Sequence, residues 1–125
     1  MRKILIVDDS EGIRTLIREV LQAEGYVVEE TNDGWEALEW IRSINYDLIL
    51  LDVKLPGLNG MDVLKTMRDE GINMGVIIVT AYEEINTKTD FKYLEIVASL
   101  SKPFDIQEVL EKVNQYMEGH KPKNG

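Results

Sequence analysis

The sequence predicts an α/β protein, a three-layer doubly wound sandwich with a five-stranded parallel sheet at its centre. Two observations favour this fold class. First, four short and mostly apolar runs each end at a polar residue; they cover residues 4–7, 48–51, 76–79 and 96–101. Such runs are typical of strands that are buried on both faces of a sheet. Second, segments with the apolar spacing of amphipathic helices alternate with these runs, as crossovers between parallel strands require.

The order of the strands follows from their polarity. A further strand is predicted over residues 26–30, and its polar end favours an edge of the sheet. The run 96–101 belongs, on weaker grounds, at the other edge. These positions predict the strand order 2-1-3-4-5, a flavodoxin-like arrangement, in which the order reverses between the strands at 4–7 and 48–51. Open α/β sheets bind ligands in the crevice at such a reversal.

A helix is predicted after each strand. Asp33, Asn59 and Asp105 each open one, and Asp33 with Glu36 forms a capping-box pattern. The segment 83–94 should hold the fourth helix, but its composition is poor for a helix, so we expect a short or mobile one. The first helix has apolar residues at helical spacing on the face that should point inward: Ile13, Leu16, Ile17, Val20 and Leu21.

Length and composition indicate one domain and exclude several classes of protein. The 125 residues predict a single domain over 1–118 and a disordered tail over 119–125. The chain has no cysteine, which excludes disulfides and thiolate metal sites and fits a cytoplasmic protein. No apolar run is long enough for a membrane span, and the first one starts too early for a signal peptide. The net charge of −9 argues against direct binding to nucleic acid.

Polar residues that follow the apolar runs would meet at one edge of the sheet. Asp8 and Asp9 follow the first run, Asp52 the second, Thr80 the third and Lys102 the fourth. Three carboxylates suit Mg²⁺, and without a cation they would repel one another. A carboxylate can also attack phosphorus, while a hydroxyl and an ammonium group stabilise the phosphoryl oxygens. The sequence therefore predicts a magnesium-dependent phosphoryl site, with Asp52 either a ligand only or a nucleophile as well.

Each of these residues also has an ordinary structural interpretation. Acidic residues at strand ends can simply cap the next helix. For Asp9 alone this interpretation is as good as a metal ligand, but it explains the three carboxylates together poorly. Thr80 alone fits a β-branched strand residue, and Lys102 fits a strand-end lysine in solvent. The position of Lys102 directly before Pro103 favours a fixed geometry, because proline restricts the residue that precedes it.

Four motifs, taken together and in this order, resemble the receiver domain of two-component response regulators. They cover residues 4–9, 50–60, 79–81 and 102–104, and the similarity extends to about Met117. The resemblance implies that Asp52 is the phosphoacceptor and that the Lys102–Pro103 peptide is cis. It implies that the metal ligands are the carboxylates of Asp8, Asp9 and Asp52 and the backbone carbonyl of Lys54. It implies that the phosphoryl oxygens are bound by Thr80 and Lys102.

The same resemblance implies a function and a set of partners. The chain would take a phosphoryl group from a phosphohistidine onto Asp52 with Mg²⁺, and would then pass it on or switch partner binding. It would not be a conventional turnover enzyme, but an acceptor and donor with slow self-dephosphorylation. The implied partners are a sensor histidine kinase and, in a phosphorelay, a histidine phosphotransferase. We expect a cytoplasmic monomer that binds neither nucleic acid nor a membrane.

Further short matches resemble stand-alone phosphorelay receivers of the sporulation type. They lie at residues 12–14, 54–57, 80–82 and 102–106. This closer resemblance implies that Gly12, Ile13 and Leu16 belong to the surface that docks a kinase or phosphotransferase. The alternative is that Ile13 and Leu16 are core residues, and for Leu16 the spacing favours the core.

Some positions depart from the receiver pattern, and two other functions are alternatives. Ser99 stands where many receivers have an aromatic residue, and Glu95-Ile96 stands where Gly-Ala is common. Lys54 and Tyr82 occupy positions that flank the phosphorylation pocket in the family.

The chain could instead be the receiver fragment of a DNA-binding transcription regulator. A magnesium-dependent phosphatase would need a carboxylate close after the nucleophile, where this chain has Lys54.

Overall fold

Five parallel strands form the middle layer of the computed structural model, which describes residues 1–80 and 93–120. The strands are β1 (Lys3–Val7), β2 (Val27–Thr31), β3 (Leu48–Asp52), β4 (Gly75–Thr80) and β5 (Ala98–Ser101). Their order in the sheet is β2-β1-β3-β4-β5, and every neighbouring pair is parallel. The predicted fold class and strand order are therefore confirmed, with the two predicted edge strands at the edges.

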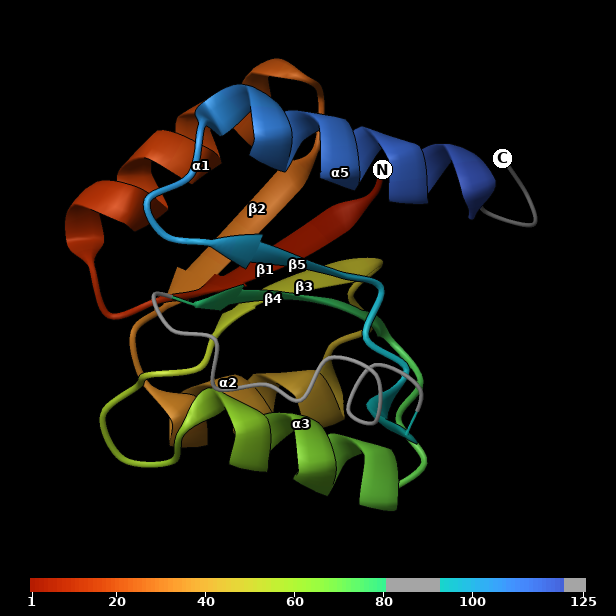
Figure 1. Cartoon of the computed structure of the whole chain (residues 1–125). Coiled ribbons are helices and arrows are strands. Elements are labelled where there is room, and N and C mark those ends of the chain that lie inside the picture. The colour runs from red at the N-terminus through yellow and green to blue at the C-terminus, as the bar shows by residue number, and fades with distance from the viewer. Residues whose placement is uncertain (81–92, 121–125) are drawn as a thin grey trace.

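Helices cover both faces of the sheet and complete the three layers. The described helices are α1 (Glu11–Ala23), α2 (Gly34–Ser43), α3 (Gly60–Asp69) and α5 (Ile106–Gly119). In Figure 1, α1 and α5 lie on one face, while α2 and α3 lie on the other. None of the helices within residues 1–80 and 93–120 combines the length and the apolar character that crossing a membrane requires.

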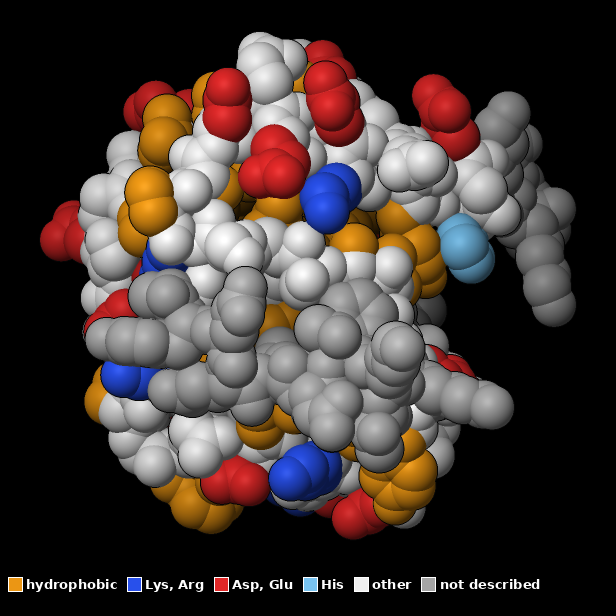
Figure 2. Space-filling model, in the orientation of Figure 1, with side chains coloured by type: hydrophobic (Ala, Val, Ile, Leu, Met, Phe, Trp, Pro, Cys, Tyr) orange, Lys and Arg blue, Asp and Glu red, His pale blue; other side chains and the backbone are white. Residues whose placement is uncertain are grey.

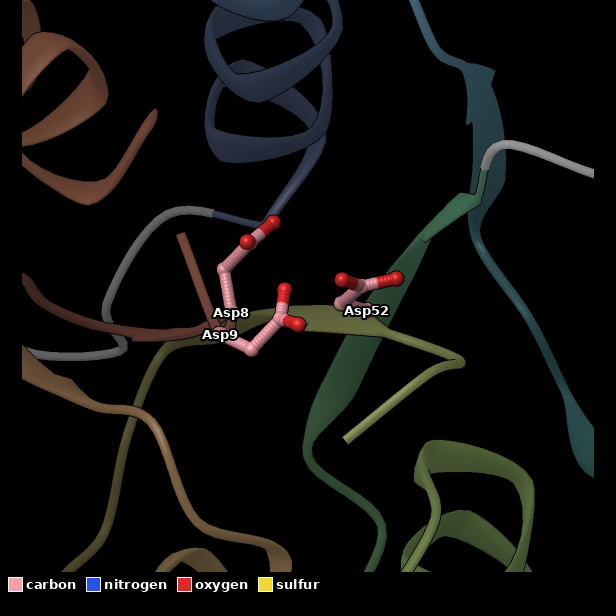
Figure 3. A group of neighbouring side chains, drawn as sticks. All are labelled: Asp8, Asp9 and Asp52. Carbon is pink, nitrogen blue, oxygen red and sulfur yellow. The ribbon is translucent and has the colours of Figure 1, made fainter. Parts of the chain in front are cut away.

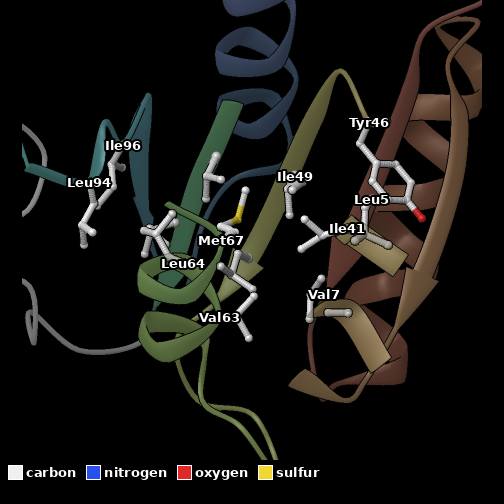
Figure 4. Close-up of a cluster of buried hydrophobic side chains, with 14 of the residues drawn as sticks. Leu5, Val7, Ile41, Tyr46, Ile49, Val63, Leu64, Met67, Leu94 and Ile96 are labelled. Carbon is white, nitrogen blue, oxygen red and sulfur yellow. The ribbon is translucent and has the colours of Figure 1, made fainter. Parts of the chain in front are cut away.

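Two hydrophobic clusters, one on each face, hold the layers together. Successive strand residues point to opposite faces, so β1 sends Leu5 and Val7 to the α2–α3 side and Ile4 and Ile6 to the α1–α5 side. All four side chains are fully or almost fully buried. Figure 4 shows the cluster beneath α2 and α3. Burial on both faces explains why the central strands are continuous apolar runs.

The inward face of α1 is narrower than the apolar spacing predicted. Ile17 and Leu21 are buried, whereas Leu16 is 47% exposed, so the preference for Leu16 as a core residue was wrong. Adjacent helix residues point about 100° apart, and the stripe of α1 that faces the sheet is centred on Ile17 and Leu21, so Leu16 falls outside it. Leu16 therefore lies on the outer surface of α1.

Each helix that was predicted from a capping residue begins directly after that residue, which is its N-cap. The side chains of Asp33, Asn59 and Asp105 accept hydrogen bonds from backbone N–H groups in the first turns of α2, α3 and α5. The capping box at Asp33 forms only in part. Glu36 accepts a hydrogen bond from the Thr31 hydroxyl (2.5 Å) instead of turning back to the Asp33 N–H, which itself donates to the Thr31 hydroxyl oxygen.

Two predicted segments fall largely outside the described residues. Of the weak helix predicted over 83–94, residues 83–92 lie outside the described residues, and so does Tyr82. Most of the predicted tail, from residue 121 onward, lies outside them too. The described part shows that α5 continues through Gly119, the residue at which we expected the tail to begin.

Glu95 occupies a backbone conformation that an L-amino acid adopts at a cost. Its φ is +55°, in the left-handed region, at the position where the receiver pattern commonly has glycine. Arg68 of α3 fixes the turn by donating to the Leu94 carbonyl oxygen at 2.8 Å and, more weakly, to that of Glu95 at 3.4 Å. The backbone is thus held in place while the side chain at position 95 is exposed.

This conformation predicts that Glu95→Gly is more stable than Glu95→Ala. Both variants remove the side chain beyond Cβ, but only glycine adopts a left-handed φ without strain. For other residues this conformation costs about 1 kcal/mol or more. We expect the glycine variant to exceed the alanine variant by about 0.5–1 kcal/mol in the free energy of unfolding. Urea denaturation followed by circular dichroism measures the difference. Equal stabilities would show that position 95 is not strained.

Candidate functional site

The ends of β1 and β3 bring three carboxylates together at one edge of the sheet. In the sheet register Val7 pairs with Leu51, so Asp8 and Asp52 follow at neighbouring positions. One oxygen from each of Asp8, Asp9 and Asp52 lies within 4.8 Å of the others. Asp8 and Asp52 are buried, while Asp9 is exposed. Figure 3 shows the three side chains around a common space, Asp8 and Asp9 at the end of β1 and Asp52 on β3.

The Lys102 ammonium group joins two of these carboxylates. Its Nζ lies 2.9 Å from Asp8 Oδ2 and 3.0 Å from Asp52 Oδ2. Its side chain is only 17% exposed, so the interpretation of Lys102 as a lysine in solvent was wrong. The Lys102 N–H also donates to the Thr80 carbonyl oxygen at 2.8 Å, and the peptide to Pro103 is cis as expected. The end of β5 thus delivers a positive charge to the carboxylates of β1 and β3.

Burial and charge shift the pKa values of the paired groups. Burial raises the pKa of Asp52, and the nearby Asp8 carboxylate raises it further, while the hydrogen bond from Lys102 opposes the shift. Burial alone would lower the pKa of Lys102, but its hydrogen bonds to Asp8 and Asp52 outweigh that effect and the pKa is raised. Among residues 1–80 and 93–120, Lys102 is the only residue that forms ion pairs with these three carboxylates, so this part of the chain leaves an excess of negative charge that a cation can neutralise.

Asp52 is fixed by the turn that follows it. The Lys54 N–H donates to Asp52 Oδ1 at 3.3 Å, while Lys102 holds Oδ2. Gly60, the first residue of α3, lies directly against the backbone of Asp52. A Cβ atom at position 60 would come within 2.0 Å of the Asp52 carbonyl oxygen, so only glycine fits there. The side-chain pattern of β3 and α3 does not reveal this contact between backbone atoms, so it was not predicted from the sequence.

Thr80 and Lys54 lie where the sequence predicted, at the same edge. Thr80 is the last residue of β4 and is buried, and its neighbour Val79 pairs with Asp52 in the register. Lys54 is exposed beside a hollow of about 590 Å³ that Asp9 and Asn59 also line. The acidic cluster is therefore open to solution on the Asp9 side. Its donor set consists of carboxylate oxygens, which fits a hard cation such as Mg²⁺.

Comparisons with known proteins agree with this geometry. The family model of the response regulator receiver domain matches residues 4–114. Sporulation initiation phosphotransferase F of Bacillus subtilis is 43% identical over 115 residues, which cover 92% of this chain and 93% of that protein. Response regulator MprA of Mycobacterium avium is 32% identical over 122 residues, which cover 98% of this chain but only 54% of MprA.

Solved structures show the same fold at comparable identity. The receiver domain of the Francisella response regulator 1452 superposes with a TM-score of 0.88 at 33% identity, covering 97% of this chain and all of that one. TrrA of Thermotoga maritima, solved in complex with Mg²⁺ and BeF, gives a TM-score of 0.79 at 36% identity over 93% of this chain and 99% of TrrA. The chain belongs to the response regulator receiver domain family.

Proposed function

We propose that Asp52 accepts a phosphoryl group from a phosphohistidine, in a Mg²⁺-dependent reaction, and that the chain then passes the group on or switches partner binding. The observation that carries the proposal is the arrangement around Asp52. Its buried carboxylate forms an ion pair with the Lys102 ammonium and lies beside two further carboxylates, of which Asp9 lines an open hollow. A nucleophile, a positive charge and a candidate cation site thus meet at the edge where open α/β sheets bind ligands.

The residues of the chain have separable tasks in this transfer. An Asp52 oxygen attacks phosphorus, an O–P bond forms, and the N–P bond to the donor histidine breaks. Lys102 lies 3.0 Å from Asp52 Oδ2, within reach of the oxygens of an attached phosphoryl group, and Thr80 supplies a hydroxyl from the adjacent strand. Mg²⁺, when held by Asp8, Asp9, Asp52 and the Lys54 carbonyl, would neutralise the negative charge of the phosphoryl oxygens.

Similarity favours the phosphorelay role over the alternative of a transcription regulator. The matching phosphorelay protein shares 43% identity with this chain along 93% of its own length, whereas MprA shares 32% along 54% of its length. We therefore propose a role in a sporulation phosphorelay. In that role the chain receives its phosphoryl group from a histidine kinase and transfers it to a histidine phosphotransferase.

The outer face of α1 supports a docking surface for these partners. Leu16 is 47% exposed, and Gly12 and half-buried Ile13 lie on the same helix, close after the acidic site. In the view of Figure 2, acidic side chains gather on the side of the molecule formed by α5. This acidic side and the chain's net charge of −9 do not suit binding to nucleic acid. We therefore propose a cytoplasmic monomer whose partners are proteins.

The first prediction tests the phosphoacceptor. Acetyl phosphate with MgCl₂ should add one phosphoryl group to the wild-type chain, and removal of Mg²⁺ with EDTA should prevent it. Asp52→Asn should abolish the addition, because the amide is not a nucleophile at this site. Intact-protein mass spectrometry measures the product. A phosphoryl group that persists in the Asp52→Asn chain would show that another residue accepts it.

The second prediction concerns Asp9, which no ion pair links to another of the described residues. Asp8 and Asp52 are partly neutralised by Lys102, so removing the charge of Asp9 is the simplest way to reduce the repulsion among the three carboxylates. Asp9→Asn should raise the melting temperature of the metal-free chain and reduce the stabilisation by Mg²⁺. Glu111→Gln, on the exposed face of α5, is the control for the same change in charge. A metal-free melting temperature that falls in Asp9→Asn would contradict the repulsion.

The third prediction concerns Leu16. Leu16→Ala should slow phosphoryl transfer from autophosphorylated histidine kinases by about tenfold, because an apolar anchor at an interface contributes about 1–2 kcal/mol. Phosphorylation by acetyl phosphate should stay unchanged, since this small donor needs no docking surface. Val97→Ala, which also truncates an exposed apolar residue, serves as the control. Equal losses with both donors would place the defect in the site rather than in docking.

A further inference from the structure

The short connection between β1 and α1 contains two of the three carboxylates of the site. β1 ends at Val7 and α1 begins at Glu11, so Asp8 belongs to neither element. Its backbone groups therefore need partners from elsewhere. The Asp8 N–H donates to the Thr31 carbonyl oxygen at 3.2 Å, and Asp8 Oδ1 accepts from the Ser10 N–H at 2.9 Å.

Arg14 provides the partner for the Asp8 carbonyl. Its Nη1 donates to that oxygen at 2.7 Å, reaching back from α1 over the start of the helix. Its Nε donates to Glu30 Oε1 at 3.0 Å, and the other oxygen of Glu30 accepts from Arg18. The Arg14 side chain is only 13% exposed, against 35% for Arg18. Glu30 of β2 thus holds the guanidinium of Arg14 in the orientation that contacts Asp8.

We infer that Arg14 is a positioning residue of the metal site, acting through the peptide that joins Asp8 to Asp9; the inference rests on the proposed function. A peptide group is planar, so fixing the Asp8 carbonyl oxygen also fixes the direction in which the chain continues to Asp9. Asp9 is exposed and has no ion pair to another described residue that would direct its carboxylate toward Asp52. The Arg14 contact supplies that direction from the backbone side.

Two variants separate this contact from a general effect of charge. Arg14→Gln and Arg18→Gln each remove one positive charge and one contact to Glu30, but only the first removes the donor to Asp8. MgCl₂ titrations followed by the amide NMR shifts of Asp8, Asp9 and Asp52 measure the affinity. Arg14→Gln should weaken Mg²⁺ binding about tenfold, the scale typical of groups that orient metal ligands, and Arg18→Gln less than about twofold. Equal changes in the two variants would overturn the inference.

A milder variant covers the case in which Arg14→Gln does not fold. Arg14→Lys keeps the charge, but a lysine lacks the planar fork that contacts Asp8 and Glu30 together. Its loss of Mg²⁺ affinity should lie between those of Arg18→Gln and Arg14→Gln. An affinity equal to that of the wild-type chain would show that the fork does not matter.

A double-mutant cycle tests whether Arg14 acts through Asp9. In an Asp9→Asn chain the carboxylate that Arg14 positions is already gone, so Arg14→Gln should change the remaining Mg²⁺ affinity by less than about twofold. A tenfold loss in both backgrounds would mean that Arg14 supports the fold instead. If the wild-type chain binds Mg²⁺ and is phosphorylated while Arg14→Gln matches it, only this inference falls. If the wild-type chain does neither, the proposed function falls first.

Discussion

The bridge from the Lys102 ammonium to Asp8 and Asp52 is the interaction on which the rest of the site depends. Two carboxylates that are almost fully buried would repel each other and lose their hydration without a counter-charge. Lys102 lies 2.9 Å and 3.0 Å from them and joins the ends of three strands, β1, β3 and β5. Its own position is fixed by the hydrogen bond from its N–H to the Thr80 carbonyl oxygen. The charges of the site are therefore held by the sheet itself.

This bridge leaves the site incompletely neutralised, and that imbalance suits the proposed chemistry. The Lys102 ammonium, which supplies the only ion pairs to these carboxylates among the described residues, cannot neutralise all three, so this arrangement favours a cation. A phosphoryl group attached to Asp52 would bring new anionic oxygens within reach of Lys102. The ammonium could then exchange a carboxylate partner for a phosphoryl oxygen without a large movement. In the proposed function, the same residue would stabilise the unphosphorylated chain and respond to phosphorylation.

The sheet and the composition of the site were predictable from the sequence because both follow from where apolar runs end. Parallel strands share one edge for their carboxyl ends, so the sequence alone predicted that Asp8, Asp52 and Lys102 lie together. Leu16 could not be placed correctly, because apolar spacing does not tell how wide a stripe the sheet will cover. The approach of Gly60 to Asp52 and the contact of Arg14 with the Asp8 carbonyl involve backbone atoms, which leave no periodic signal.

The most direct test is a crystal structure of the chain with MgCl₂ and beryllofluoride, a mimic of the phosphoryl group. The proposed function predicts beryllium on a carboxylate oxygen of Asp52, Mg²⁺ among Asp8, Asp9 and Asp52, and Lys102 Nζ donating to a fluoride instead of to Asp52. Beryllofluoride bound to another residue would contradict it. So would a Lys102 side chain that points away from the fluorides.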